Sequence, residues 1–197
     1  MTREVWRETI KGITTHILKS IDGADSDNIN KFVKELTDAK RIFIYGAGRS
    51  GLAARAFAMR LMHLERHVFV IGETITPSMQ PEDLFVCITG SGETSSVIDY
   101  MKSAKKRGSK IVCVTSHPKS TAAGMSELVV LIKGKTKIDV GDDYHKRQVK
   151  GEHASFTPMG TLFEDTVTVF FDGIIAELMF KLNKNEEQMF KKHASVE

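Results

Sequence analysis

Two short loops rich in glycine and hydroxyl residues carry the most evident chemistry in this sequence. The first is Gly46-Ala47-Gly48-Arg49-Ser50-Gly51, and the second is Thr89-Gly90-Ser91-Gly92-Glu93-Thr94. Each loop follows a short apolar run and precedes a segment with helical periodicity. Glycine lets the backbone approach a ligand closely, and the N–H groups and dipole of the following helix attract negative charge. The two loops therefore predict a phosphorylated ligand that is held from two sides.

The first loop also has an alternative interpretation as a dinucleotide-binding fingerprint. Its glycines match the spacing G-x-G-x-x-G after a strand, and Glu73 stands about where such a site needs an acid for the ribose. However, Gly72 separates Glu73 from the preceding apolar run, and a dinucleotide does not need the second loop. A P-loop is excluded, because no Gly-Lys-Ser/Thr follows the glycines. Phosphate binding is favoured, and the dinucleotide interpretation stays open as the alternative.

The segments around the loops predict an alternation of helices and short strands. The strands are expected at 41–45, 68–71, 84–88, 110–115 and 128–132. The helices are expected at 2–21, 24–38, 50–64, 94–107, 121–125, 161–182 and 186–192. The strands are apolar and β-branched without alternation, which is typical of strands that are covered on both faces in a parallel sheet.

This order of elements predicts an α/β fold. We expect a three-layer α/β/α sandwich of flavodoxin-like type, with a five-stranded parallel sheet, two leading helices and a C-terminal helix. The 197 residues are expected to form one domain, with a helical segment at 1–39, an α/β core at 40–182 and a tail helix at 183–197. Ligands of such folds bind at the carboxyl ends of the strands, where both loops begin. The charged stretch 133–158 does not fit the alternation and is expected to be an exposed loop, a lid or partly disordered.

Composition limits the classes of function. The net charge is +3 with scattered basic residues, so nucleic acid is not an expected partner. No apolar run is long enough to span a membrane, and the N-terminus is charged where a signal peptide would be apolar. The 7 histidines form no pair at zinc-ligand spacing, and neither a metal nor another cofactor is expected. Cys87 and Cys113 lie in apolar runs, as buried cysteines do in a reducing compartment, which favours a cytoplasmic protein.

Both loops resemble those of the sugar isomerase (SIS) domain family. The resemblance narrows to the 6-phospho-3-hexuloisomerases in four further segments, at 56–64, 72–77, 158–164 and 189–194. It covers the chain from about residue 2 to the C-terminus, and the sequence departs from the pattern mainly at 137–157, which looks longer and more charged. The resemblance implies interconversion of D-arabino-hex-3-ulose 6-phosphate and fructose 6-phosphate. The implied context is the ribulose monophosphate pathway, in formaldehyde fixation or in pentose phosphate supply.

The implied reaction moves a carbonyl group from C3 to C2 through an enediol. It needs an anchored phosphate, a base near the carbons and donors to the oxygens, but no redox cofactor. The candidate substrate-binding residues all come from the two loops: Gly48, Arg49, Ser50, Thr89, Gly90, Ser91, Gly92, Glu93 and Thr94. Ordinary N-capping is the simpler alternative for the hydroxyl groups. The carboxylate of Glu93 would repel phosphate, so we expect it to orient the second loop through hydrogen bonds.

Glu164 is the candidate catalytic base that the resemblance favours. It follows Pro158-Met159-Gly160-Thr161, a loop expected to enter a helix, so its carboxyl group can face the carboxyl edge of the sheet. The alternative is that Glu164 is only a first-turn glutamate stabilised by the helix dipole. The neighbouring Asp165 is the other carboxylate that could be the base. His193 is the second candidate catalytic residue, as a proton shuttle in its own site or in that of a neighbouring subunit. A tail residue without a role is the alternative for this histidine.

The expected partners are a phosphorylated ketohexose and further copies of the chain. The apolar faces of the two leading helices, together with Met59 and Met62, indicate at least a dimer, and the resemblance implies a tetramer. A function of another class stays open, because SIS domains also serve as sugar-phosphate sensors in regulators. A sensor would need both loops but not Glu164. The sequence contains no recognisable helix-turn-helix segment, which favours the enzyme.

Overall fold

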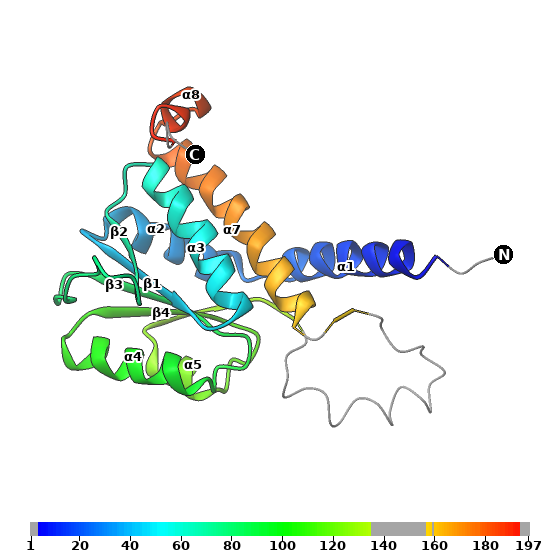
Figure 1. The fold of residues 1–197 in the computed structure, drawn as a ribbon, viewed down its shortest axis with the longest axis horizontal. Helices are drawn as coiled ribbons and strands as arrows, with labels where there is room; N and C mark the ends of the chain where they lie inside the picture. The colour runs from blue at the N-terminus through cyan, green and yellow to red at the C-terminus, as the bar shows by residue number, and fades with distance from the viewer. Residues whose placement is uncertain (1–3, 135–156, 159, 194–197) are drawn as a thin grey trace.

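A five-stranded parallel sheet forms the centre of the molecule, as the sequence predicts (Figure 1). The computed structural model describes residues 4–134, 157–158 and 160–193. The strand order is β2-β1-β3-β4-β5. In chain order the strands are β1 (Ile42–Gly46), β2 (Val68–Val70), β3 (Leu84–Ile88), β4 (Lys110–Thr115) and β5 (Leu128–Leu131).

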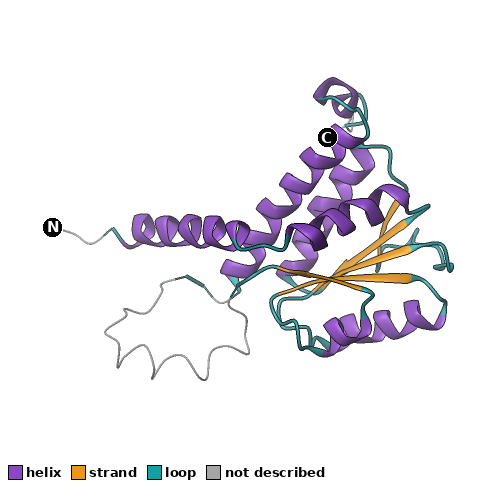
Figure 2. Cartoon of the chain, turned by 180° about the vertical axis from the view of Figure 1, so that it is seen from behind, coloured by secondary structure: helices purple, strands orange, loops and turns teal. Residues whose placement is uncertain are grey.

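Helices cover both faces of this sheet and confirm the predicted three layers (Figure 2). One face carries α2 (Ser26–Asp38), α3 (Arg49–His63) and α7 (Thr161–Lys181), and the other carries α4 (Ser95–Lys106) and α5 (Thr121–Met125). Helix α1 (Val5–Asp22) packs on α7 and projects from the body, and α8 (Glu186–Phe190) follows α7. Within the described ranges, no helix is long and apolar enough to cross a membrane. Most of the charged stretch 133–158 lies outside the described residues.

Strands β1 to β4 each contribute side chains to two separate cores, which explains why these strands are apolar without alternation. In β3, Leu84, Val86 and Ile88 enter the core beneath α2, α3 and α7. The intervening Phe85 and Cys87 enter the core beneath α4 and α5. Because both faces are buried, the period of two that marks a half-exposed strand is not visible in the sequence.

The order of the strands places the two glycine loops side by side. In the register between β1 and β3, Gly46 lies opposite Ile88, so the first loop leaves the sheet next to the second. The chain then turns to α3 on one face and to α4 on the other. A reversal of this kind opens a crevice at the carboxyl ends of the strands, which is where α/β folds bind ligands.

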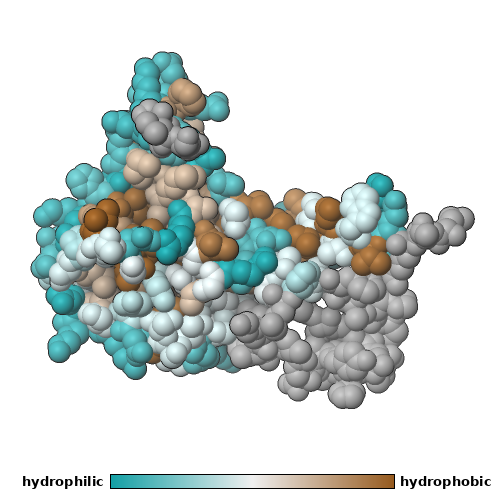
Figure 3. Space-filling view, viewed as in Figure 1, coloured by the Kyte–Doolittle hydropathy of each residue, from teal (hydrophilic) through white to brown (hydrophobic). Residues whose placement is uncertain are grey.

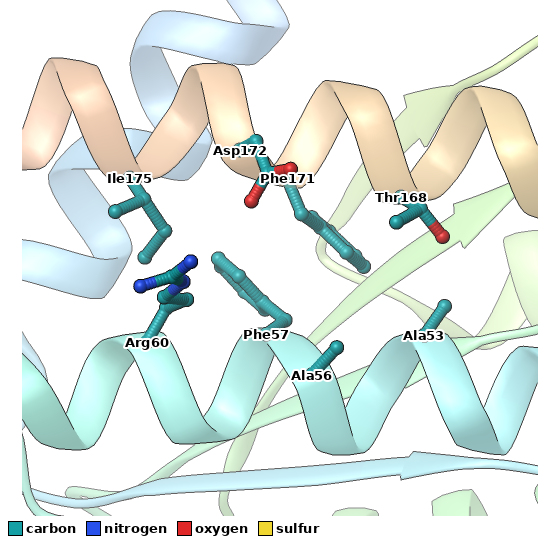
Figure 4. A pocket seen from close by; sticks show the side chains of 8 residues that line it. All are labelled: Ala53, Ala56, Phe57, Arg60, Thr168, Phe171, Asp172 and Ile175. Carbon is teal, nitrogen blue, oxygen red and sulfur yellow. The ribbon is translucent and has the colours of Figure 1, made fainter. Parts of the chain in front are cut away.

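Aromatic stacking fixes α7 against the layer of helices above the first loop. The rings of Phe57 on α3 and Phe171 on α7 stack with centroids 4.1 Å apart and an interplanar angle of 8°. Phe32 on α2 stacks on Phe170 with centroids 6.4 Å apart. Since α3 and α7 run alongside each other in this packing, their first turns lie at the same edge of the sheet (Figure 4).

Candidate functional site

The first loop delivers the start of α3 to the carboxyl edge of the sheet. Gly48 occupies the N-cap position of α3, and no side chain caps this helix. A Cβ atom on Gly51 would lie 2.6 Å from the carbonyl oxygen of Gly46, so the helix begins in direct contact with the end of β1. Ser50 lies in the first turn with its side chain largely buried. The first N–H groups of α3 are therefore presented at the carboxyl edge of the sheet without a side-chain acceptor.

The second loop is held in shape by its own hydroxyl groups. The N–H of Gly92 donates to Oγ1 of Thr89 at 3.1 Å, and the N–H of Glu93 donates to Oγ of Ser91 at 3.2 Å. Gly92 has φ +69°, and a Cβ atom there would lie 1.9 Å from Oγ of Ser120, so only glycine fits. Thr94 is the N-cap residue of α4, but its side chain makes no capping hydrogen bond. N-capping therefore does not account for the hydroxyl group of Thr94.

Glu93 orients the second loop, as expected. Its Oε1 accepts a hydrogen bond from the N–H of Thr121, and its Oε2 accepts one from the hydroxyl of Thr121, both at 2.7 Å. The bond from the backbone N–H of Thr121, followed by the one from its hydroxyl, lowers the pKa of Glu93. The N–H of Ala122 also donates to the carbonyl of Gly92 at 3.0 Å. These bonds hold the second loop against the start of α5, and both carboxylate oxygens of Glu93 take part in them.

The candidate base lies against the arginine of the first loop. Nε of Arg49 donates to Oε2 of Glu164 at 2.6 Å, and Nη2 of Arg49 lies 3.4 Å from Oδ1 of Asp165. The side chain of Glu164 is 17% exposed and that of Asp165 is 41% exposed. Gly160, at the N-cap of α7, has φ +86°, and a Cβ atom there would lie 2.8 Å from Oε2 of Glu164. Glu164 is therefore the more buried of the two acids at this edge and the closer one to Arg49.

Glu73, the acid that the dinucleotide alternative requires for the ribose, is paired with a basic side chain. Glu73 forms an ion pair with Arg55 on α3. The strand order 2-1-3-4-5 also differs from the order 3-2-1-4-5-6 of dinucleotide-binding folds. Both observations weigh against that alternative. In the part of the chain that the structure describes, no group of three His, Cys, Asp or Glu residues could hold a metal ion.

Comparison with known proteins identifies the family of this chain. The model of the SIS domain matches residues 35–144, which is more than half of the sequence. The chain belongs to the SIS domain family. A protein from Aeropyrum pernix is 42% identical over 194 residues, which cover 96% of this chain and 92% of that one. A 3-hexulose-6-phosphate isomerase from Bacillus subtilis is 33% identical over 190 residues, covering 96% of this chain and 98% of that one.

A solved structure shares this SIS fold at a similar level of sequence identity. It is a hypothetical protein from Methanococcus jannaschii whose structure was described as inferring a molecular function of 3-hexulose-6-phosphate isomerase. It superposes with a TM-score of 0.81 and 32% identity, covering 96% of this chain and 99% of that one. The family resemblance expected from the sequence is therefore confirmed.

Within one copy of this SIS domain, His193 does not join Glu164. The ring centroid of His193 lies 5.3 Å from that of His63, the last residue of α3. His63 stands a whole helix away from Arg49, which corresponds to about 21 Å at the α-helical rise. His193 therefore does not lie beside Glu164 of its own copy, and its catalytic role stays a prediction.

Sequence reasoning missed the residues at the carboxyl end of β4 in this SIS domain. Thr115, the last residue of β4, and the next two residues, Ser116 and His117, all contact the second loop through the carbonyl oxygen of Gly90. The signal that could have found them is their position. They lie at the carboxyl end of a buried strand, as the two glycine loops do, and two of the three carry hydroxyl groups.

Proposed function

We propose that this chain is a 3-hexulose-6-phosphate isomerase, which interconverts D-arabino-hex-3-ulose 6-phosphate and fructose 6-phosphate through an enediol. The similarity to proteins of that name along almost the whole chain supports the substrate. The single observation that carries the mechanism is the contact between Arg49 and Glu164. It joins the proposed base to the loop that we propose to bind the phosphate.

In the proposed site the phosphate binds between the two loops. Helices α3 and α4 both begin there, and neither has a side-chain cap, which supports their use by an external anion. The N–H groups of the loops and first turns would donate to the phosphate, with the guanidinium of Arg49 at the edge. The remaining loop residues would complete the site: Gly48, Ser50, Thr89, Gly90, Ser91, Gly92 and Thr94, with Glu93 holding the second loop in place.

Glu164 is the proposed base of the reaction. It would remove the proton from C2 of the hexulose phosphate, and return of a proton to C3 of the enediol would complete the isomerisation. Arg49 contacts Oε2 of this carboxylate. Oε1 has no hydrogen-bond partner among the described residues, which supports this oxygen as the one that takes the proton. Neither a metal nor a redox cofactor is part of the proposal, since an enediol route can run on side chains alone.

The proposal includes a homo-oligomer, a tetramer in preference to a dimer, in which His193 shuttles protons at a neighbouring site. Exposed apolar side chains support self-association. Hydrophobic surface is visible along the projecting helix α1 (Figure 3), where Trp6, Ile10 and Leu18 are each more than half exposed. A second apolar feature is the groove between α3 and α7, lined by Ala53, Ala56, Phe57, Arg60, Thr168, Phe171, Asp172 and Ile175 (Figure 4).

The whole chain is proposed to act as one SIS domain, with the helical segment 1–39, the core 40–182 and the tail 183–197. The hydrophobic core that joins α2, α3 and α7 to the sheet supports a single domain. We place the enzyme in the cytoplasm and its reaction in the ribulose monophosphate pathway. In one direction this reaction completes formaldehyde fixation, and in the other it supplies pentose phosphate.

The decisive experiment is incubation of the purified chain with D-arabino-hex-3-ulose 6-phosphate and enzymatic detection of fructose 6-phosphate. Turnover in the parent and its loss in Glu164→Gln would support the proposal. Tight binding of fructose 6-phosphate without any turnover would instead favour a sugar-phosphate sensor. Absence of both binding and turnover would overturn the proposed site.

A further inference from the structure

The carbonyl oxygen of Gly90 in the second loop is approached by more donors than it needs. It lies 2.8 Å from Nδ1 of His117 and from Oγ of Ser116, and 3.2 Å from the N–H of Ser116 and from Oγ1 of Thr115. A carbonyl oxygen has two lone pairs. The N–H of Ser116 alone is enough to continue the parallel ladder between β3 and β4. The side chains after β4 therefore add a constraint that the sheet does not require.

The ring of His117 is held so that Nδ1 donates to this carbonyl. A carbonyl oxygen can only accept, so an Nδ1 atom at 2.8 Å from it must carry the proton. The backbone N–H of His117 donates to Oγ1 of Thr115 at 3.2 Å, and Oγ of Ser116 lies 3.1 Å from Nδ1. These contacts hold both the backbone and the imidazole ring of His117 in place. His117 is thus a rigid donor aimed at the second loop.

The direction of the Gly90 carbonyl determines the direction of the next N–H group. In a planar trans peptide the C=O of Gly90 and the N–H of Ser91 point to opposite sides, and the described residues contain no cis peptide bond. The carbonyl points toward the end of β4. Because β3 lies between β4 and β1, the N–H of Ser91 points toward the end of β1, where the first loop begins.

The N–H of Ser91 also has no acceptor among the residues that the structure describes. The two residues that follow it differ in this respect. The N–H of Gly92 and that of Glu93 donate to hydroxyl groups of the loop itself. Among these three consecutive amides, that of Ser91 is therefore the one that is left to face the first loop.

We propose that His117 is a positioning residue for the phosphate site: it holds the Gly90 carbonyl toward β4 and thereby aims the N–H of Ser91 at the phosphate. The identity of the ligand rests on the proposed function. His117 touches neither the phosphate nor the reacting carbons in this scheme. It acts through one peptide group, and its effect should appear in phosphate affinity rather than in the chemical step.

Two substitutions of matched polarity test this role. In His117→Asn the amide nitrogen can occupy the position of Nδ1, because it is the same number of bonds from the backbone. In His117→Gln the amide is displaced by one bond. The probes are inorganic phosphate and fructose 6-phosphate, titrated while the backbone amides are followed by NMR, together with steady-state KM and kcat.

We expect phosphate to move the Ser91 amide proton downfield in the parent and in His117→Asn. His117→Gln should bind phosphate at least about tenfold more weakly and raise KM by a similar factor, because one hydrogen bond to a charged group is lost, while kcat changes little. Equal phosphate affinity in His117→Gln and the parent would overturn the proposal. So would equal losses in both variants, since a purely structural role would not distinguish them.

The parent alone gives a test that does not depend on the folding of any variant. If phosphate shifts other amides of the two loops but leaves that of Ser91 unchanged, the assignment of His117 is wrong and the phosphate site stands. If phosphate shifts no amide in either loop, the proposed phosphate site fails, and the role of His117 fails with it.

Discussion

Arg49 and Glu164 are separated by 115 residues in the sequence, yet Nε of the arginine lies 2.6 Å from Oε2 of the glutamate. The arginine side chain is half exposed, whereas the glutamate side chain is mostly buried. Ion pairs with an exposed partner add little to stability. The significance of this pair lies in placement, because it fixes the distance between the first glycine loop and the start of α7.

The first prediction concerns the base. Glu164→Gln keeps the shape of the side chain and removes the proton acceptor, so turnover should fall by about 10²- to 10⁴-fold, the usual contribution of a general base. Binding of fructose 6-phosphate should persist, because the loops are unchanged. Turnover, ligand binding and exchange of the C2 proton with deuterated solvent are the measurements.

Asp165→Asn is the matched control for this prediction. Asp165 is more exposed than Glu164 and lies farther from Arg49, so its amide variant should be much milder. If Asp165→Asn abolishes turnover while Glu164→Gln keeps it, the base has been assigned to the wrong carboxylate. If neither variant matters, a sensor becomes the better interpretation of the domain.

The second prediction concerns the phosphate anchor. Ser50→Ala and Thr94→Val should each raise KM, since a hydrogen bond to a charged group contributes about 1.5–3 kcal/mol. Turnover should fall as well if phosphate binding positions the reacting carbons. Ser103→Ala on the exposed side of α4 is the control and should behave like the parent. If both anchor variants have the same KM and kcat as the parent, the hydroxyl groups of Ser50 and Thr94 do not bind the phosphate.

The third prediction concerns the glycine that precedes the base. Gly160→Ala introduces a Cβ atom 2.8 Å from Oε2 of Glu164, at a position where φ is +86°. The flexible carboxylate can move aside, so the base should be displaced and kcat should fall. The positive φ should also cost about 1–2 kcal/mol of stability. Kinetics and urea unfolding measure the two effects, and an unchanged kcat would show that the position of the carboxylate is not critical.

The fourth prediction concerns the pH dependence of stability. Burial lowers the pKa of His63, with further contributions from the charges of His193 and Arg60. Because the unfolded chain then binds this proton more tightly than the folded one, the free energy of unfolding should decrease as the pH falls below about 6.5. His63→Gln should lose less stability between pH 7.5 and pH 5.5 than the parent. Urea unfolding at both pH values measures this, and equal losses would assign the acid sensitivity to other groups.

Local patterns were enough to predict the elements of this fold. The apolar runs of β3 and β4 are bounded by polar or glycine residues, so their predicted limits agree with the structure. The parallel sheet also follows from a pattern, because short buried strands separated by helices favour parallel pairing with right-handed connections. The glycine loops could be recognised for the same reason, since each is a continuous stretch of sequence.

Contacts between distant segments could not be predicted in this way. The approach of Glu164 to Arg49 depends on how α7 packs on α3, and this packing is decided by the stacking of Phe57 on Phe171. The contact of His117 with the Gly90 carbonyl requires the register of β3 and β4. His193 illustrates the same limit, because a residue near the C-terminus can fold back onto any surface that its linker reaches.

The starts of the helices divide into two kinds, and the division links binding to stability. Helices α2, α5 and α8 are capped by the side chains of Asp25, Ser120 and Asn185. Helices α3, α4 and α7, which begin around the proposed site, have no such cap, and neither does α1, which begins away from it. A missing cap costs about 1 kcal/mol. A bound phosphate ester would supply what α3 and α4 lack, so the substrate completes the secondary structure of the enzyme, and ligand at a hundredfold excess over Kd would raise the free energy of unfolding by about 2.7 kcal/mol.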